Sequence, residues 1–352
     1  MTALRTGFTT GSCAAACALA SCLWQTDGNA PSHVRITLPD GTLYTPEIHT
    51  LAPYRCGVFK DSGDDPDITD GCEVWAEVTP GTGDGPVAFA AGDGVGTVTR
   101  SGLKLPPGEA AINPVPRQMI ENAVRSVFPA RSVLVTVGIT GGRELAERTF
   151  NPRLGITGGL SILGTTGIVH PMSESALIET IQLECRMRAA EGTREICFVF
   201  GSQGEAVLAH LRPDLTCVQI SNFVGSALDI TAELGFDRVL LAGQPGKLVK
   251  VAGGCMQTHS RYGDGRRETL CAHLALSGAP KDLLEAVMTA NTLDSLIPMI
   301  DAAGYSSVFT QLCQAACTYM SARAARIPSA HLRPGAMMLD SAGRILGEYY
   351  EP

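Results

Sequence analysis

The spacing of apolar and polar positions changes near the middle of the chain, and this change predicts two domains. Residues 33–139 contain short runs that alternate apolar and polar side chains, such as CEVWAEVTP at 72–80, which is typical of strands. Asp40-Gly41 lies between two such runs and indicates a hairpin. The segment 114–128 instead spaces its apolar residues three and four apart behind two prolines, which predicts a helix. Strands with helices at their edges indicate an α+β domain over residues 1–150.

Beyond residue 150, apolar strands alternate with helical segments. The runs EICFVFG, TCVQI and DRVLLAG are separated by helical patterns at 205–211 and 223–234. This alternation predicts a parallel, Rossmann-like sheet, and such sheets bind ligands beyond the carboxyl ends of their strands. Four further helical stretches, from about residue 266 to residue 326, precede a short strand pair around 341–343. We therefore expect an α/β Rossmann-like domain with additional C-terminal helices over residues 151–352.

The segment 151–174, NPRLGITGGLSILGTTGIVHPMSE, lies between these two patterns and is rich in glycine and hydroxyl side chains. Glycine lets a ligand approach the backbone closely, and hydroxyl and N–H groups supply hydrogen-bond donors. Ser173 is a candidate N-cap for the following helix, and a helix N-terminus suits an anionic or polar ligand. Turns and close strand packing are the alternative explanation of the glycines. The helix would bury an apolar face made of Leu177, Ile178, Ile181, Cys185 and Met187. We expect the segment to line a cleft between the two domains.

Composition and charge restrict the class of protein. With 352 residues, 45% hydrophobic and 18% charged, the chain is globular and long enough for two domains. A net charge of -8 argues against nucleic-acid binding, which depends on many Lys and Arg side chains. No apolar run reaches transmembrane length. Leu19-Ala20-Ser21-Cys22 resembles a lipoprotein cleavage box, but a capped helix in a cytoplasmic protein explains its apolar surroundings better.

The cysteines suggest buried thiols rather than a disulfide framework or a metal site. Twelve are scattered among apolar segments of a long chain. Cys13 and Cys17, like Cys313 and Cys317, are four residues apart and would share a helix face. Because neither pair has a CxxC spacing or a nearby histidine, we expect no metal bound by the protein itself.

Two glycine loops follow predicted strands. Gly92-Asp93-Gly94-Val95-Gly96 is succeeded by β-branched residues and prolines, so no helix follows it, and we expect a bulged hairpin or a substrate-facing loop. Gly201 and Gly204 lie between a strand and a helix and are better placed to contact a cofactor.

The loop KDSGDDPDITDG at 60–71 concentrates carboxylates. It departs from the EF-hand pattern, because Pro66 and Cys72 occupy positions that need glycine and glutamate. A solvated turn is one interpretation. The other is a general base, since clustered carboxylates raise one another's pKa, and Asp64 and Asp65 are its candidates.

Basic residues gather after the strand DRVLLAG. Lys247 resembles a phosphate-loop lysine, but GxxxxGK[ST] is absent, which disfavours nucleotide hydrolysis. Lys250 and Arg266 add positive charge that an anionic ligand would need in an acidic protein. A lone histidine is more often structural than catalytic, yet the charged neighbours of His259 make it a candidate catalytic residue.

Seven blocks follow one another along the chain: RTGFTTG at 5–11, GDDPD at 63–67, GDGVGTVT at 92–99, AINPVPRQMI at 111–120, the segment 151–174, GKLVKVAGG at 246–254, and THS to DGRRE at 258–268. In this order they resemble the cobalt-precorrin-5B (C1)-methyltransferase family of cobalamin biosynthesis, often called CbiD. The resemblance covers residues 5 to about 268 and adds little in the helical C-terminal part. Mild departures are Gln244, Gly263 and Ser12, where the family commonly has His, Ala and Thr.

The resemblance implies methyl transfer from S-adenosylmethionine to C1 of cobalt-precorrin-5B, giving cobalt-precorrin-6A, in the anaerobic, early-cobalt route. It also implies a fold distinct from other tetrapyrrole methyltransferases, with cobalt present only as part of the corrinoid substrate. Candidate cofactor-binding residues are Gly158, Gly159, Gly164, Thr165, Thr166, Ser173, Gly201 and Gly204. Candidate ligands of the corrinoid carboxylates are Arg117, Arg153, Lys247, Lys250 and Arg266. Candidate bases are Asp64, Asp65 and His259.

Two other classes compete with this interpretation. A non-catalytic corrinoid carrier or scaffold would explain the basic cluster but not a cofactor loop. A phosphate-loop or nicotinamide enzyme would explain the glycines but lacks an intact GxGxxG at a strand–helix junction and a Walker lysine. The sequence leaves the number of subunits open, a homo-oligomer included.

Overall fold

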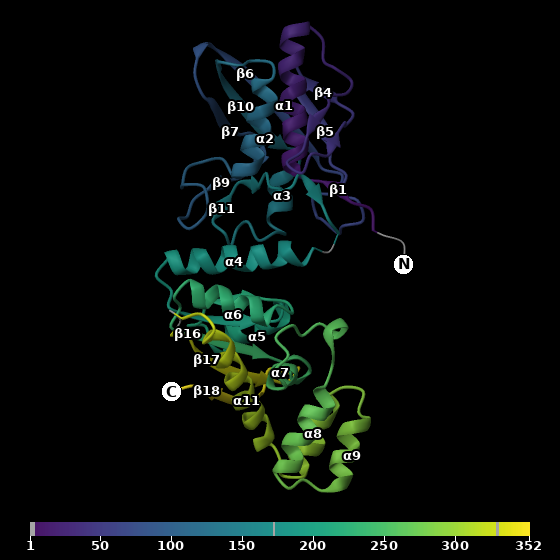
Figure 1. The fold of residues 1–352 in the computed structure, drawn as a ribbon, viewed down its shortest axis with the longest axis vertical. Helices are drawn as coiled ribbons and strands as arrows, with labels where there is room; N and C mark the ends of the chain where they lie inside the picture. The colour runs from purple at the N-terminus through teal and green to yellow at the C-terminus, as the bar shows by residue number, and fades with distance from the viewer. Residues whose placement is uncertain (1–3, 172, 329–330) are drawn as a thin grey trace. The chain divides into compact units, whose positions relative to one another are not determined.

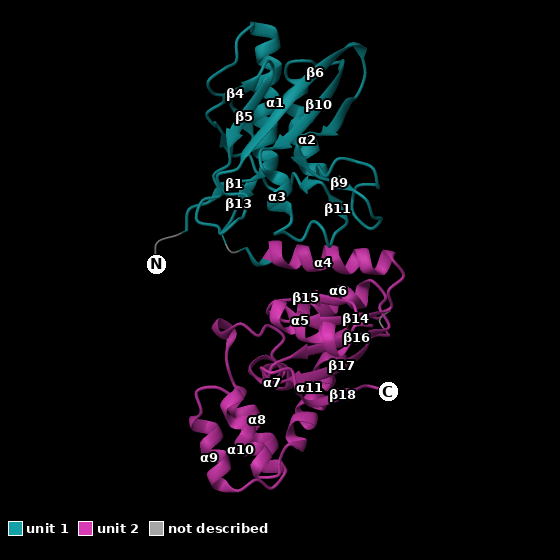
Figure 2. Ribbon diagram, turned by 180° about the vertical axis from the view of Figure 1, so that it is seen from behind, with its two compact units in different colours: residues 1–174 teal, residues 175–352 magenta. Residues whose placement is uncertain are grey.

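The computed structural model describes residues 4–171, 173–328 and 331–352 (Figure 1). It divides the chain into two compact units, residues 1–174 and 175–352 (Figure 2). Both units combine helices with β-sheet, so the prediction of a mixed α and β chain is confirmed.

The boundary between the units follows residue 174 rather than residue 150, where the change of pattern predicts it. The physical reason is strand pairing within the glycine-rich segment 151–174, which completes the sheets of the first unit. Three of its short strands pair with earlier ones: β11 (Ile156–Thr157) with β9 (Thr97–Val98), β12 (Gly159–Leu160) with β8 (Gly94–Val95), and β13 (Ile168–Val169) with β1 (Gly7–Phe8).

The main sheet of the first unit has five strands in the order β4-β5-β6-β10-β7. Neighbouring strands are antiparallel, except for β10 and β7, which are parallel. Val74, Ala76 and Val78 of β6 are buried on one face, as the alternating pattern predicts. The strands are β4 (His49–Ala52), β5 (Arg55–Phe59), β6 (Glu73–Asp84), β7 (Val87–Ala91) and β10 (Arg131–Ile139).

Helices α1 (Thr10–Asp27) and α2 (Pro114–Arg125) share the apolar core with that sheet. The central positions of α1 are mostly alanine and cysteine, and they are buried all around the helix. Such small side chains allow close packing against the neighbouring strands and helix. α2 has the predicted stripe, with Met119, Ile120 and Val124 buried, and it begins at a proline.

The smaller elements of the first unit follow the sequence pattern. β2 (Ile36–Thr37) and β3 (Leu43–Tyr44) form the predicted hairpin, with Gly41 at φ 88° in its turn. The loop 92–96 leads from β7 through β8 to β9 and not into a helix, as predicted. α3 (Gly142–Ala146) follows β10.

The sheet of the second unit has the order β15-β14-β16-β17-β18. The first four strands are parallel, and β18 runs antiparallel to β17 at the edge. The parallel pairing predicted from the alternation of strands and helices is therefore present. The strands are β14 (Glu195–Val199), β15 (Cys217–Gln219), β16 (Arg238–Gly243), β17 (Arg333–Leu339) and β18 (Ile345–Tyr350).

The helices of the second unit cover the two faces of this sheet unequally. α4, α6, α7 and α11 share a large core with one face, whereas α5 packs on the other through Leu208. One expected core residue is wrong: Leu177 of α4 is 48% exposed, while Ile181, Cys185 and Met187 are buried. The helices are α4 (Glu174–Ala190), α5 (Ser202–Leu211), α6 (Val224–Glu233), α7 (Pro245–Ala252) and α11 (Ser307–Ala324).

The C-terminal helical stretches are present as predicted. They comprise α8 (Arg266–Leu276), α9 (Lys281–Thr289), α10 (Ile297–Ala302) and α11, with short 3₁₀ turns η1 (Ser260–Tyr262) and η2 (Asp294–Leu296). All twelve cysteines are free thiols, and eight of them are buried. Among the described residues, none of the helices combines the length and apolar character needed to cross a bilayer.

Candidate functional site

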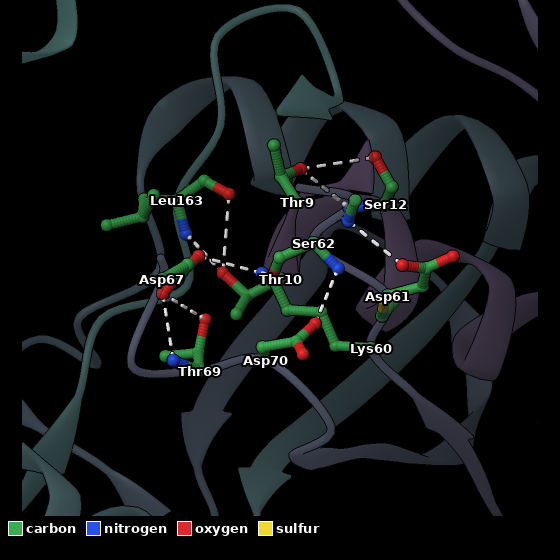
Figure 3. A network of polar contacts seen from close by, with 12 residues as sticks. Thr9, Thr10, Ser12, Lys60, Asp61, Ser62, Asp67, Thr69, Asp70 and Leu163 are labelled. Atoms are coloured by element: carbon green, nitrogen blue, oxygen red, sulfur yellow. Dashed lines mark hydrogen bonds and ion pairs between the residues drawn. The ribbon is translucent and has the colours of Figure 1, made fainter. Parts of the chain in front are cut away.

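The N-terminus of α1 is enclosed by the chain's own glycine-rich segment (Figure 3). Thr9 caps the helix, because its Oγ1 accepts a hydrogen bond from the Ser12 N–H at 3.2 Å. The Gly11 N–H donates to the Leu163 carbonyl at 3.1 Å, and Thr10 Oγ1 accepts from the Leu163 N–H at 3.0 Å. These donors of the first turn already have acceptors inside the protein, so they are not offered to a ligand.

Two of the candidate cofactor glycines are required for packing. A Cβ at Gly164 would collide with Thr9, and a Cβ at Gly159 would collide with the backbone of Gly94. Gly158 has open space around it at φ 84°. The close-packing explanation of the glycine-rich segment therefore holds for Gly159 and Gly164.

The hydroxyl side chains of the same segment lie near the surface. Thr165 and Thr166 are exposed, and Thr166 Oγ1 donates to the Ile168 carbonyl at 3.1 Å. Ser173 is half-buried and directly precedes α4, where the sequence predicts a cap. The cleft between domains that this segment is expected to line stays a prediction.

Replacing Gly164 with alanine is expected to lower the free energy of unfolding by about 2 kcal/mol, because the new methyl group would overlap Thr9. The backbone angle φ of Gly164 is 131°, which also disfavours alanine. Gly158→Ala is the matched control, since φ is also positive there but the space is open, and it should cost about 1 kcal/mol. Urea denaturation of the two variants compares them. Equal losses would mean that backbone conformation, not the Thr9 contact, sets the requirement for glycine.

The acidic loop 60–71 is organised around a buried lysine. The Lys60 side chain is only 1% exposed, and its ammonium lies 2.7 Å from Asp67 Oδ2 and also donates to Ser62 Oγ. The Ser62 N–H donates to Asp70 Oδ1 at 2.8 Å, and the Thr69 N–H donates to Asp67 Oδ1 at 2.8 Å. Figure 3 shows these side chains beside the N-terminus of α1.

The expectation that clustered carboxylates raise one another's pKa is wrong for two members of the loop. Hydrogen bonds from Arg5 and from the Gly63 N–H lower the pKa of Asp61. Burial would raise the pKa of Asp67, but the nearby Lys60 ammonium and the hydrogen bonds from Thr69 outweigh it, so the pKa is lowered. Cations and backbone donors, absent from a purely acidic cluster, explain the difference.

The two candidate bases in this loop have different surroundings. Asp64 is exposed, and its Oδ2 accepts from the Arg5 N–H at 2.7 Å while its own N–H donates to the Arg5 carbonyl at 2.9 Å. Asp64 therefore holds the N-terminal segment. Asp65 is half-buried, and its N–H points toward the Ser62 carbonyl at 3.4 Å.

The two candidate arginines of the first unit contact neighbouring residues of the same unit. The Arg117 guanidinium donates to the carbonyls of Ile112, at 2.8 Å, and Ala110, at 3.1 Å, and it also pairs with Glu109. These contacts give Arg117 a structural role, because they tie the first turn of α2 to the segment that precedes it. Arg153 lies over the ring of Phe150, with 5.8 Å between the guanidinium carbon and the ring centroid.

In the second unit, the predicted glycine and lysine residues come together at the carboxyl ends of parallel strands. Gly201 follows β14, Asn222 follows β15, and Lys247 follows β16 in the first turn of α7. Because these strands are parallel neighbours, their carboxyl ends share one edge of the sheet. This is the edge at which open α/β sheets bind ligands.

Gly201 differs from the glycines of the first unit. Its φ of -177° is an extended conformation that any residue adopts, and among the described residues nothing lies within 4 Å of the place where a Cβ would be. Neither conformation nor internal packing requires glycine there, and the missing side chain leaves this stretch of backbone open to close approach. A Cβ at Gly204 would make an ordinary contact with Val199.

Lys247 is a half-buried cation at this edge whose side-chain acceptor is neutral. Its Nζ lies 2.5 Å from Oδ1 of Asn222, which is an amide. Burial lowers the pKa of Lys247, and the positive charges of Lys250 and Arg266 lower it further. The ammonium therefore stands in a region of positive potential that favours an anion.

The other two predicted cations hold a loop in place. Lys250 is buried and donates to the carbonyls of Thr258, at 3.3 Å, and Gly263, at 3.0 Å. Arg266 binds Asp264 through two nitrogens, at 2.5 and 2.6 Å. This hydrogen-bonded pair lowers the pKa of Asp264 to about 2. Their charges and donors are thus largely used within the protein.

His259 is exposed on the loop that Lys250 holds. Its Nδ1 accepts a hydrogen bond from the Arg261 N–H at 3.2 Å. In the neutral ring this bond assigns the proton to Nε2. In that tautomer Nε2 is a hydrogen-bond donor.

Sequence reasoning missed Ser221 and Asn222. Ser221 has φ 49°, a left-handed conformation that is uncommon outside glycine. The signal available in the sequence was their position directly after the run TCVQI, where a parallel strand ends.

An open recess lined by Asp237, His331 and Arg333 lies at the opposite, amino-terminal edge of the sheet.

Across residues 4–171, 173–328 and 331–352, no group of three or more His, Cys, Asp or Glu side chains is arranged to hold a metal ion. The polar groups that converge at the carboxyl edge are instead an amide, hydroxyls and a lysine. Such a set suits an organic anion rather than a divalent cation.

Comparison with known proteins gives consistent results. The profile of the family described as CbiD matches residues 1–171, and that of the CbiD C-terminal domain matches residues 257–350. A cobalt-precorrin-5B C(1)-methyltransferase of Desulfitobacterium hafniense is 42% identical, over 89% of this chain and 82% of the relative. Its counterpart in Alkaliphilus metalliredigens is 41% identical, over 88% and 84%. The crystal structure of a cobalamin biosynthesis protein (cbiD) from Archaeoglobus fulgidus is 26% identical, covers 75% of this chain and 84% of its own, and gives a TM-score of 0.40.

Proposed function

The chain belongs to the CbiD family, and on that basis we propose that it methylates C1 of cobalt-precorrin-5B. The methyl donor is S-adenosylmethionine, the product is cobalt-precorrin-6A, and the reaction belongs to the anaerobic route to cobalamin in the cytoplasm. The observation that carries the proposal is an identity of 41–42% with relatives named for this methyl transfer, over 88–89% of the chain.

Within the chain, we assign both ligands to the carboxyl edge of the second unit's sheet, which then works as a Rossmann-like sheet. The methyl donor lies against Gly201, where the backbone is open to close approach, and against the first turn of α5, which contains Gly204. A carboxylate at the fringe of the corrinoid binds Lys247, whose acceptor Asn222 is uncharged. Nε2–H of His259 donates a second hydrogen bond to the same kind of group.

Most of the protein's contribution to this reaction is positioning. S-adenosylmethionine, when bound, supplies a methyl group on a positively charged sulfur that leaves as a neutral thioether. Lys247 and the loop of His259 would hold the macrocycle so that its C1 can reach that methyl group. Asp64 and Asp65, both carboxylates accessible at least in part to solvent, remain our candidates for a general base.

The decisive experiment is anaerobic incubation of the purified protein with methyl-labelled S-adenosylmethionine and cobalt-precorrin-5B. The proposal requires label at C1 of the corrinoid and one equivalent of S-adenosylhomocysteine. Tight corrinoid binding without methyl transfer would instead indicate a carrier or scaffold. Replacing Asp64 and Asp65 with asparagine in the same single-turnover assay tests the base, and unchanged rates in both variants would remove them from the mechanism.

Gly201→Ala is expected to weaken binding of S-adenosylhomocysteine about tenfold, because the new methyl group enters space assigned to the ligand. Folding stability should change by less than about 0.5 kcal/mol, since the backbone is extended and the space is empty. Gly83→Ala is the matched control, as a Cβ there also meets nothing within 4 Å. Calorimetric titration with S-adenosylhomocysteine compares the affinities of the two variants, and urea denaturation compares their folding stabilities. Equal affinities in the two variants would move the cofactor site elsewhere.

A further inference from the structure

Asn222 lies at the carboxyl edge, just after the outermost strand β15, and connects three segments of the second unit. It follows β15 and immediately precedes Phe223, the N-cap of α6. The residue before it, Ser221, has φ 49°, so the chain turns sharply between the strand and the helix. Left-handed conformations at non-glycine residues persist where the surroundings fix them, and they concentrate at functional sites.

The side-chain oxygen of Asn222 accepts two hydrogen bonds from different segments. Nζ of Lys247, on α7, lies at 2.5 Å, and Oγ1 of Thr258, on the loop before η1, lies at 3.0 Å. Thr258 is buried, with 1% of its surface exposed. One amide oxygen therefore fixes both the lysine and the loop that carries His259.

The backbone reinforces this arrangement. The Thr258 N–H donates to the Asn222 carbonyl at 3.1 Å, and the Gly225 N–H donates to the Met256 carbonyl at 2.9 Å. The loop is thus bound to the start of α6 independently of the Asn222 side chain. A change confined to that side chain should leave the loop in place. It should mainly alter the position of the Lys247 ammonium and the charge next to it.

The chemical type of the acceptor matters. Asn and Asp have nearly the same shape, but a carboxylate 2.5 Å from Lys247 would neutralise its charge in an ion pair. The neighbouring cation Arg266 is already paired with Asp264 in this way. A neutral amide orients the ammonium while leaving its positive charge uncompensated.

We propose that Asn222 is a positioning residue that holds Lys247, with its charge uncompensated, toward a carboxylate of the bound corrinoid. This inference rests on the proposed function. It deepens that function by naming the group that determines how strongly Lys247 attracts an anionic substituent.

The first test needs no substrate. The lysines of the whole protein are converted to ¹³C-dimethyl-lysine, the Lys247 signal is identified by its loss in Lys247→Arg, and it is titrated by NMR. Asn222→Asp is expected to raise the pKa of Lys247 by about one unit or more, because an opposite charge favours the ammonium. Asn113→Asp, at an exposed N-cap in the first unit, adds the same charge as a control and should leave that signal unchanged.

The second test uses the methyl-transfer assay with the same variants. Asn222→Asp is expected to raise KM for the corrinoid at least tenfold with kcat within about threefold of wild type, while the affinity for S-adenosylhomocysteine is retained. Asn222→Ala, which keeps the backbone bonds of the loop, should also raise KM. The inference is overturned if Asn222→Asp leaves the pKa of Lys247 unchanged, or if it leaves the KM for the corrinoid unchanged. A wild-type protein without methyl transfer instead contradicts the proposed function, and the NMR result stands separately.

Discussion

Replacing Lys60 with methionine is expected to lower the free energy of unfolding of the first unit by about 3–5 kcal/mol at pH 7. The lysine side chain is 1% exposed and its ion-pair partner Asp67 is 26% exposed, so the variant leaves a largely buried carboxylate without its cation. Methionine keeps the volume and flexibility of the side chain. Urea denaturation followed by tryptophan fluorescence measures this unit specifically, because both tryptophans, Trp24 and Trp75, lie in it.

The effect of pH gives this prediction a second, independent check. In the wild type the pKa of Asp67 is lowered in the folded state, so its contribution is present above the unfolded pKa, about 4, and is lost as pH falls through the folded pKa. Without Lys60 the buried carboxyl of Asp67 binds a proton more readily. The difference in the free energy of unfolding between Lys60→Met and the wild type should therefore shrink as pH falls below about 4.

Two further variants identify the cause. Lys60→Met combined with Asp67→Asn removes both charges and should recover much of the lost stability. Arg143→Met, which breaks a pair of the first unit whose arginine is 67% exposed, should cost less than about 1 kcal/mol. A difference for Lys60→Met that is constant from pH 3 to pH 7 would mean that packing, not the ion pair, accounts for the loss.

Replacing Lys247 with methionine is expected to reduce kcat/KM for the corrinoid about 100-fold, corresponding to about 2.7 kcal/mol, a typical value for a hydrogen bond to a charged group. Most of the loss should appear in KM, because a carboxylate at the rim of the macrocycle is held equally before and during methyl transfer. Steady-state kinetics with each substrate varied in turn measures the split. Binding of S-adenosylhomocysteine should be unchanged.

The pH dependence of corrinoid binding follows from the environment of Lys247. The charged form binds the carboxylate, and burial together with Lys250 and Arg266 lowers the pKa of this lysine. Corrinoid affinity should therefore decline in the alkaline range at a lower pH than an ordinary lysine, near 10.4, would give. Lys247→Arg should abolish that decline, since arginine keeps its charge. An unchanged KM in Lys247→Met would remove this residue from the substrate site.

The elements of the fold could be predicted largely because they depend on local patterns. The alternation in β6, the prolines before α2 and the strand–helix succession from β14 to β16 each appear within a short window of sequence. The limit of the first unit could not be predicted in this way. Strand β13 pairs with β1, more than 150 residues earlier, and no local pattern records that pairing.

For Gly201 and Lys247, the sequence correctly indicates a position just after a parallel strand. Lys250 shows the limit, because the sequence treats it as equivalent to Lys247 although it is buried and binds backbone carbonyls. Gly164 shows the same limit, since only the fold reveals that Thr9 lies against it. The residue type of Asn222 did not mark it as a candidate in the sequence. Its contacts depend on the folded positions of two donors, Lys247 on α7 and Thr258 on the loop before η1.

The pairing of β1 with β13 constrains how the first unit is made. On the ribosome, Gly7 and Phe8 are synthesised first, but their partners Val169 and Ile168 emerge only near the end of the unit. The Leu163 carbonyl that accepts from the first turn of α1 is also made late. The first unit can therefore complete these contacts only after residue 169 has been synthesised. A nascent chain that stops before residue 163 lacks the partners of β1 and of the first turn of α1.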